Sequence, residues 1–199
     1  MKKSDLFKNE IKNIISEDYR MFAEYYMDEC VPNYFYEIGA SSSGKYHPGF
    51  SQGVGGLVRH TKAVVMFCEE LLNLSTYSYM KEEYKDYAIM ACIFHDTVKY
   101  GFEYDTSEYK KHSQNAAKNV NKAWCEYFGT DAPELLLMAI RSHMGQWEPN
   151  KDDRPFTNLD RLVHMSDYIA SRSFIDIPQV VIEYNATVRP EISDEELPF

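Results

Sequence analysis

The chain contains 199 residues, of which 44% are hydrophobic and 26% charged, and this length and composition predict one globular domain with a substantial core. The formal net charge of −10 disfavours a broad surface for long nucleic acids, which bind mainly through their phosphates, but leaves a small phosphorylated substrate open. No apolar run approaches the roughly 20 residues that cross a bilayer, and no signal peptide is visible, so we expect a cytoplasmic protein without a membrane partner.

The first part of the chain predicts a helix followed by a long loop. Apolar residues recur at close to helical spacing from Leu6 to Met27, which predicts an N-terminal helix over about residues 5–29, ended by Pro32. Residues 39–56 are rich in glycine and serine and predict a loop. Because long structureless loops are uncommon in compact domains, this one either serves the function or is a mobile connector.

Apolar periodicity predicts five further helices, at residues 57–74, 84–100, 110–127, 133–144 and 158–174. Small and apolar residues nearly surround the second of these, as expected of a central, buried helix. Gly129 and Gly145 mark the ends of two helices, and Thr157 is a candidate amino-terminal cap for the last.

The C-terminal extension, residues 175–199, has a different character. Residues 180–188 look extended and predict a strand or an irregular covering segment, and residues 190–199 are acidic and expected to be loose. No internal repeat and no second domain are visible. The fold prediction is therefore an all-α bundle in a single domain, with a short irregular or extended C-terminal segment.

The cysteines predict packing rather than chemistry. They stand far apart and form no C-x-x-C pair, at Cys30, Cys68, Cys92 and Cys125. Three of them lie in apolar helical contexts, where a free cysteine usually behaves as a small buried hydrophobe.

Six histidine and aspartate side chains form the most informative pattern. They are scattered over the predicted helices, at His60, His95, Asp96, His112, His143 and Asp167. Their spacing forms no local zinc-finger or EF-hand loop, so a shared site requires several helices to converge. Four imidazoles and two carboxylates suit a borderline divalent metal with room for water. Such a metal activates water at neutral pH, which makes phosphoester hydrolysis the first reaction to consider.

The adjacent pair His95-Asp96 is the sharpest signal in this set. It lies at the carboxyl end of an apolar helix, where a carboxylate without a partner is costly. The alternative is a helix-ending histidine with a solvated aspartate, and the dipeptide alone does not decide. Lys99 lies on a facing surface and is either a phosphate ligand or an ordinary positive charge near a helix end. Taken singly, His60 is more typical of a structural histidine, whereas Asp167 in its apolar helix needs a partner.

Three sequence blocks carry a family resemblance. They read Gly-Gly-Leu-Val-Arg-His-Thr, Ala-Cys-Ile-Phe-His-Asp-Thr-Val-Lys and Ser-Asp-Tyr-Ile-Ala-Ser-Arg. In their order and wide spacing, over about residues 55–173, the chain resembles the HD-domain metal-dependent phosphohydrolases. The resemblance implies an all-helical bundle with a divalent metal held by His60, His95, Asp96 and Asp167.

The resemblance also bears on the number of ions. In binuclear members two further histidines bind a second metal, and the blocks around His112 and His143 look like their counterparts. The expected cofactors are therefore two divalent ions, with Asp96 as the bridging carboxylate. The alternative for each extra histidine is a surface or helix-end position. The ligand set does not distinguish manganese, iron, cobalt, nickel, zinc and magnesium.

The candidates for substrate binding are Lys45, His47, Arg141 and Arg172. Loops of similar sequence occur in some HD proteins, including a group resembling 3′–5′ exoribonucleases. This resemblance implies a substrate-facing role for Lys45 and His47. Gly44-Lys45 lacks the spacing of a P-loop. The two arginines are either phosphate ligands or members of surface ion pairs. Several aromatic residues near the ligand segments either stack a base or simply pack, namely Tyr46, Tyr100, Phe102, Tyr104 and Trp147.

The expected function is metal-dependent hydrolysis of a phosphoester or phosphoanhydride in a nucleotide, dinucleotide or short oligonucleotide. Asp96 and Lys99 are the expected catalytic residues, although Thr97-Val98 departs from the small residue and glycine of many members and puts the placement of Lys99 in question. The alternatives are a catalytically inactive HD-fold nucleotide-binding protein and a 3′–5′ exonuclease-like enzyme that needs a partner. The same ligands would also serve oxidative cleavage with iron, and the sequence does not decide between the two reactions. It is also compatible with a homo-oligomer.

Overall fold

The computed structural model describes residues 2–41 and 47–188, which form a helical structure. The α-helices are α1 (Lys8–Ile11), α2 (Glu17–Tyr25), α3 (Gly56–Leu72), α4 (Glu82–Phe94), α5 (His112–Phe128), α6 (Glu134–Arg141), α7 (Asn158–Ala170) and α8 (Pro178–Val188). A π-helical turn at Tyr26–Cys30 extends α2, and short 3-10 turns lie at Lys3–Phe7, Asn33–Tyr36, Gly49–Ser51, Thr106–Lys111, Gly145–Trp147 and Lys151–Asp153. These described residues include no strand, which confirms the all-α prediction. None of their helices has the length and apolar character of a membrane span.

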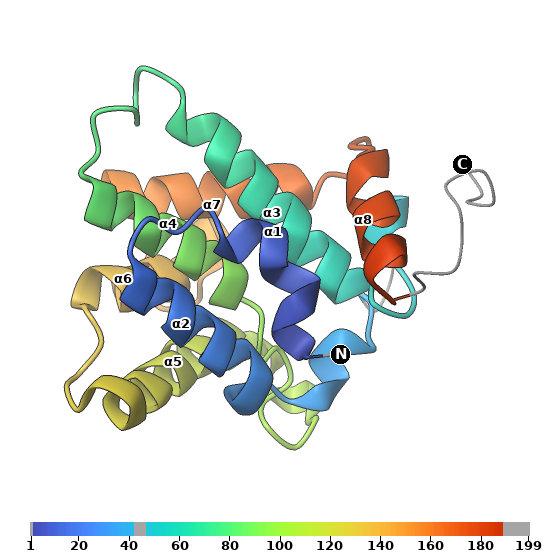
Figure 1. Cartoon of the computed structure of the whole chain (residues 1–199), viewed down its shortest axis with the longest axis horizontal. Coiled ribbons are helices and arrows are strands. Elements are labelled where there is room, and N and C mark those ends of the chain that lie inside the picture. The colour runs from blue at the N-terminus through green and yellow to red at the C-terminus, as the bar shows by residue number, and fades with distance from the viewer. Residues whose placement is uncertain (1, 42–46, 189–199) are drawn as a thin grey trace.

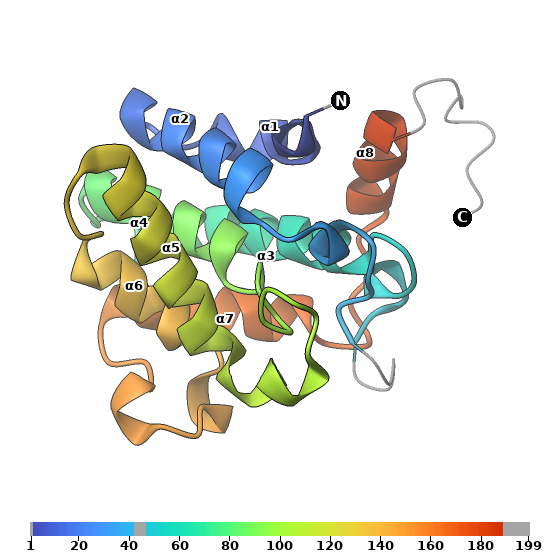
Figure 2. The same ribbon diagram turned by 90° about the horizontal axis from the view of Figure 1, so that it is seen from below.

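Helices α3 and α4 form the middle of the molecule (Figure 1). Helix α7 packs against both of them, and α1 and α2 cover their opposite side (Figure 2). Helix α6 joins α5 to this core by contacting α4, α5 and α7. Every residue of α4 from Tyr87 to Phe94 is buried, as its nearly continuous apolar surface predicts. The His-Asp pair at the end of α4 is therefore held by the most enclosed helix of the bundle.

The N-terminal helix predicted over residues 5–29 is wrong as a single element, because residues 12–16 leave the helical conformation. The carboxylate of Asp86, on α4, accepts hydrogen bonds from the main-chain N–H groups of Ile15 (2.7 Å) and Ser16 (3.0 Å). Ser16 then caps the amino terminus of α2. The break thus depends on a carboxylate distant in the sequence, which apolar periodicity does not register.

The extended C-terminal segment predicted over residues 180–188 is also wrong, because these residues belong to α8. Val180 is buried, and the Tyr184 hydroxyl lies 2.0 Å from the position that a Cβ on Gly55 would take. Gly55 has a φ of 69°, so this close approach and the backbone turn both require glycine. The β-branched residues favour a strand locally, but packing against the start of α3 selects the helix. Residues 189–199 lie outside the described part.

Arg59 fixes the loop that precedes α3. Its guanidinium donates hydrogen bonds to the main-chain carbonyls of Phe50 (2.5 Å), Gln52 (2.7 Å) and Val54 (2.9 Å). The same group lies 4.8 Å from the centre of the Tyr184 ring, so α8 covers it. In the described part, the predicted 39–56 loop is irregular apart from one 3-10 turn.

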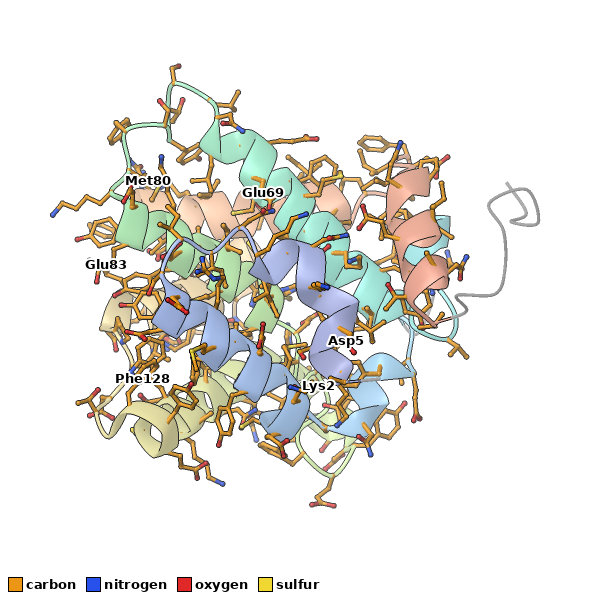
Figure 3. All side chains as sticks on the ribbon, viewed as in Figure 1. Lys2, Asp5, Glu69, Met80, Glu83 and Phe128 are labelled. Carbon is orange, nitrogen blue, oxygen red and sulfur yellow. The ribbon has the colours of Figure 1, made fainter. Side chains whose placement is uncertain are left out.

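An aromatic cluster closes the side of the bundle where α2 and α5 meet. The Phe22 ring lies 4.8 Å from Trp124, 5.6 Å from Phe128 and 6.1 Å from Phe94, measured between ring centroids. Phe128 is the last residue of α5 (Figure 3). Trp124 is consequently a core residue, in contrast to the second tryptophan of the chain, Trp147, which is 50% exposed.

The helix boundaries predicted at Gly129 and Thr157 agree with the structure, and the packing prediction holds for two of the four cysteines, because Cys30 and Cys125 are partly exposed. Gly129 follows α5 with a φ of 74°, and the Thr157 hydroxyl accepts the Asp160 N–H (3.1 Å) at the start of α7. All four cysteines are unpaired, and Cys68 and Cys92 are buried.

Candidate metal centre

The six predicted ligands converge at one place in two groups of three. Each residue offers an atom that lies within 4.8 Å of the corresponding atoms of the other members of its group. One group comprises His60, His95 and Asp167, and the other comprises Asp96, His112 and His143. They are contributed by α3, α5, α7 and the segments that follow α4 and α6. Helix packing therefore assembles a set of donors that no local stretch of sequence contains.

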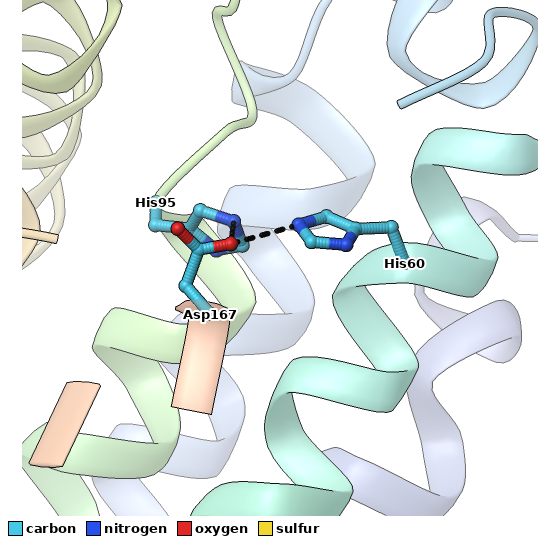
Figure 4. Close-up of side chains that lie close together, drawn as sticks. All are labelled: His60, His95 and Asp167. Atoms are coloured by element: carbon cyan, nitrogen blue, oxygen red, sulfur yellow. Dashed lines mark ion pairs between the residues drawn. The ribbon is translucent and has the colours of Figure 1, made fainter. Parts of the chain in front are cut away.

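The first group centres on the Asp167 carboxylate (Figure 4). Its Oδ1 atom lies 3.1 Å from His60 Nε2 and 3.9 Å from His95 Nε2. Both histidines are buried, whereas Asp167 is partly exposed to the cavity described below. The two imidazoles thus approach one carboxylate oxygen from different parts of the bundle, His60 from α3 and His95 from the segment that follows α4.

The second group centres on the Asp96 carboxylate. Its Oδ1 atom lies 3.3 Å from His112 Nε2 and 3.8 Å from His143 Nε2. The other oxygen, Oδ2, lies 3.7 Å from Nε2 of His95, which belongs to the first group. Asp96 therefore faces both groups and is placed to bridge them.

Hydrogen bonds on the outer side of three imidazoles fix their tautomers. Nδ1 of His95, His112 and His143 lies 2.8, 2.6 and 2.8 Å, respectively, from the main-chain carbonyl oxygen three residues earlier. A carbonyl only accepts, so each Nδ1 carries a hydrogen and each neutral ring presents the Nε2 lone pair inward. This is the arrangement in which histidine binds a metal.

Burial keeps two of these rings neutral, which creates a repulsive contact. Burial lowers the pKa of His112 and of His143 from 6.5 to about 4. Their Nε2 atoms lie only 3.0 Å apart, so at neutral pH two lone pairs face each other without a proton to share. In addition, His95 Nε2 and Asp96 Oδ1 are buried without a hydrogen-bond partner. A cation between these atoms would satisfy all of them, so the donor set fits a divalent metal.

The carboxylates are ionised. Burial favours a neutral Asp96, but the adjacent Lys99 ammonium holds the pKa of that carboxyl well below its usual range. The Lys99 ammonium donates a 2.5 Å hydrogen bond to Asp96 Oδ2. Burial likewise opposes ionisation of Asp167, and the hydrogen bond with His60 lowers its pKa. The two carboxylates give the site a negative charge that favours the binding of a cation.

A cavity of about 440 Å³ opens over both groups. It is lined by His47, His60, Asp96, Lys99, Tyr109, His112, His143, Met144, Trp147, His164, Asp167, Tyr168, Ser171 and Arg172. Volumes of this order accommodate a small organic ligand. A ligand in this cavity would therefore lie beside both candidate ion positions and the Lys99 ammonium.

Comparison with known families agrees with this geometry. Residues 57–172 match the family described as the HD domain, which covers more than half of the chain. The chain belongs to the HD-domain family. HD domains bind divalent metals and are generally metal-dependent hydrolases. No curated protein and no solved structure matches this chain.

Of the four predicted substrate-binding residues of this HD domain, two line the cavity. The His47 ring lies 5.7 Å from the His60 ring, and burial lowers the pKa of His47 to about 4. Arg172 also lines the cavity. Lys45 falls outside the described residues.

Arg141 does not take the predicted substrate position. It is not among the residues that line the cavity of the HD domain, and its guanidinium forms ion pairs with Glu134 and, at 3.3 Å, with Asp153. The surface ion pair, which was the alternative for this arginine, is therefore the arrangement observed. One of the two carboxylates, Glu134, belongs to the same helix, and the other, Asp153, lies twelve residues after Arg141.

Sequence reasoning missed the supporting roles of Tyr109 and His164 in the HD-domain site. The Tyr109 ring is stacked on His112 at 5.2 Å, and its carbonyl oxygen accepts the His112 Nδ1–H. His164 is three residues before Asp167, yet its Nδ1 donates to the main-chain oxygen of His143 (2.8 Å) rather than supporting that carboxylate. The sequence did offer a signal for the contact between Tyr109 and His112, because the two residues are three positions apart. Nothing local signalled the second.

Proposed function

We propose that this HD domain is a two-metal phosphohydrolase acting on a nucleotide, a dinucleotide or a short oligonucleotide. The observation that carries the proposal is the pair of Nε2 atoms, on His112 and His143, that face each other 3.0 Å apart beside Asp96. One ion would be held by His60, His95, Asp96 and Asp167, and the other by Asp96, His112 and His143. Two ions bound in this way polarise a phosphoryl group and lower the pKa of water at the site.

Lys99 supports phosphate chemistry from the protein side. Its ammonium is buried, lines the cavity and is oriented by Asp96 at 2.5 Å. The charge of Asp96 raises the pKa of Lys99 against the opposing effect of burial, so the side chain is cationic at neutral pH. A fixed cation beside the reacting phosphate offsets the charge that develops in the transition state. Lys99 is therefore assigned to bind a phosphate oxygen.

His47 and the shape of the site limit the substrate. His47 is neutral at pH 7, and its buried Nδ1 has no hydrogen-bond partner among the described residues, so it is free to bond a polar group of the substrate. The cavity volume of about 440 Å³ suits a nucleotide-sized ligand. The net charge of −10 disfavours long nucleic acids.

Metal content and turnover of one gently purified sample test the proposal. The substrate panel comprises mononucleotides, dinucleoside polyphosphates, cyclic dinucleotides and short RNA. We expect close to two ions per chain with hydrolysis of one of these classes, and we expect Asp96→Ala to lose both metal and activity. Asp96→Asn preserves the side-chain shape and should behave similarly, whereas Arg141→Ala, outside the cavity, should retain both.

Two results would overturn the proposal. Full turnover by a metal-loaded Asp96→Ala protein would remove Asp96 from its bridging and catalytic role. A wild-type chain that binds no metal and stays inactive after reconstitution with several divalent metals would be a nucleotide-binding protein on an HD fold. A single ion accompanied by turnover would contradict the two-metal mechanism and assign His112 and His143 to structure or substrate binding.

A further inference from the structure

One wall of the cavity, formed by Trp147, Tyr168 and Arg172, has a chemical character that the candidate metal centre does not explain. The ring of Trp147 is parallel to that of Tyr168, with an interplanar angle of 10° and a centroid distance of 5.8 Å. The guanidinium of Arg172 lies 4.2 Å from the centre of the Tyr168 ring. All three residues line the cavity, and Trp147 is still 50% exposed. The wall thus offers a flat aromatic surface next to a positive charge.

This surface is fixed relative to the metal centre. The turn that carries Trp147 begins at Gly145, which has a φ of 61°, and a Cβ there would lie 2.0 Å from the His164 imidazole. His164 in turn donates its Nδ1–H to the carbonyl oxygen of His143 at 2.8 Å. The stacking ring is therefore four residues from a candidate metal ligand, on a turn tightly packed against α7. Its distance from the metal centre is set by the fold and not by a mobile loop.

Arg172 forms no ion pair within the part of the chain that the structure describes. Among the described residues no carboxylate lies within ion-pairing distance of Arg172, which donates only to the carbonyl oxygen of Tyr168 (3.0 Å). Arg141, by comparison, is paired with both Glu134 and Asp153. An arginine that lines a cavity without an acidic partner is available to an anionic ligand.

We propose that Trp147, supported by Tyr168 and Arg172, forms the subsite that binds the base of a nucleotide. The base stacks on the exposed part of Trp147, and Arg172 binds an anionic or polar group on the same ligand. The phosphate-binding half of this assignment rests on the proposed function, because it places the reacting phosphate at Lys99 and the metal centre. Stacking is tolerant of base identity, since every base has a π face, so the subsite accepts purines and pyrimidines.

The test compares two probes that differ only in the base, AMP and ribose 5-phosphate, by calorimetric titration of the full chain. Stacking of one base on an aromatic side chain predicts about tenfold or greater preference for AMP. Trp147→Ala should reduce the affinity for AMP to that for ribose 5-phosphate and leave the latter unchanged. Trp147→Phe, which keeps a ring, should retain most of the preference. Phe156→Ala removes another exposed aromatic residue, at a position outside the cavity, and is the matched control.

Fluorescence supplies a second measurement that is independent of activity. AMP should change the emission of the wild-type protein but not that of Trp147→Phe, because the remaining Trp124 is buried in the core. Equal affinity of the wild type for the two probes, or an unchanged AMP preference in Trp147→Ala, would overturn the subsite. Loss of metal binding and turnover overturns the proposed function instead, so the two failures are distinguishable.

Discussion

Two buried lysines, Lys62 on α3 and Lys99 after α4, differ in what their ammonium groups contact. The Lys62 ammonium donates to the Leu6 carbonyl oxygen (3.0 Å) and to Glu10 Oε1 (2.6 Å), and so joins the N-terminal segment to the bundle. Lys99 donates to Asp96, a candidate metal ligand, and lines the cavity. A buried lysine thus holds two parts of the fold together in one region and lines a cavity in the other.

The difference lies in what surrounds each charge. Around Lys62, a cation meets the Glu10 carboxylate, the Leu6 carbonyl oxygen and, at 3.6 Å, the Glu183 carboxylate, so these contacts stabilise the folded chain without any ligand. Around Lys99, the neighbouring imidazole nitrogens of His112 and His143 face each other with lone pairs, and Asp96 Oδ1 has no donor. Buried polar groups are normally hydrogen-bonded, so acceptors that converge on one point without a donor form a site that suits a cation.

The largest expected effect is on stability, from Lys62→Ala. This change leaves Glu10 buried without its cation, and burial already raises the pKa of that carboxyl despite Lys62. We expect the free energy of unfolding to fall by about 3–5 kcal/mol, measured by urea titration. The double variant Lys62→Met/Glu10→Gln, which removes both charges, should recover part of the loss. A single variant as stable as the wild type would contradict a structural role for the pair.

The corresponding change at the other lysine, Lys99→Met, should affect catalysis. Loss of a fixed cation beside the phosphate predicts a fall in kcat of about 100- to 1000-fold. The metal content and the unfolding midpoint of the metal-loaded protein should stay close to wild type, since the ions themselves balance Asp96. Lys99→Arg, which keeps a cation, should be less impaired. Wild-type turnover in Lys99→Met would show that this lysine, like Lys62, is structural.

Acidification should destabilise the metal-free protein through its neutral imidazoles. The pKa values of His112 and His143 are lowered by burial to about 4, whereas in the unfolded chain they lie near 6.5. Between these values the unfolded chain binds more protons, so stability is lost as the pH falls below 6.5. Between pH 7 and pH 5 the loss should reach about 2 kcal/mol per histidine. Urea titrations at both pH values measure it, and a variant with His112→Asn should lose less; equal losses would refute the assignment.

The comparison also shows why the convergence of the candidate ligands could be predicted from the sequence and the contacts around them could not. His60, His95, Asp96 and Asp167 were predictable because their order, spacing and neighbouring blocks resemble a family pattern, and their convergence follows from the fold. The break before α2 depends on Asp86, and the position of Arg141 depends on Asp153. Both are contacts between distant parts of the chain, to which periodicity and motif spacing are insensitive.

The short-range rules failed most clearly at α8. Residues 180–188 contain β-branched side chains that favour extended structure in isolation, yet Val180 and Tyr184 pack against the bundle and the segment is helical. Thr157 and Gly129 were predicted correctly because a cap depends on the few residues beside it. The accuracy of each prediction therefore follows the range of the interaction that determines it.

The hydrogen bonds from Arg59 to the loop before α3 have a consequence for truncating this protein to the segment that matches the family. The family match spans residues 57–172, but Arg59 binds carbonyl oxygens that precede it and lies against Tyr184, which follows it. Residue 59 is also the immediate neighbour of His60. A fragment cut at the family boundaries would strip both supports from the residue adjoining the metal centre. The segment that the family shares is therefore shorter than the segment that holds the candidate ligands in place.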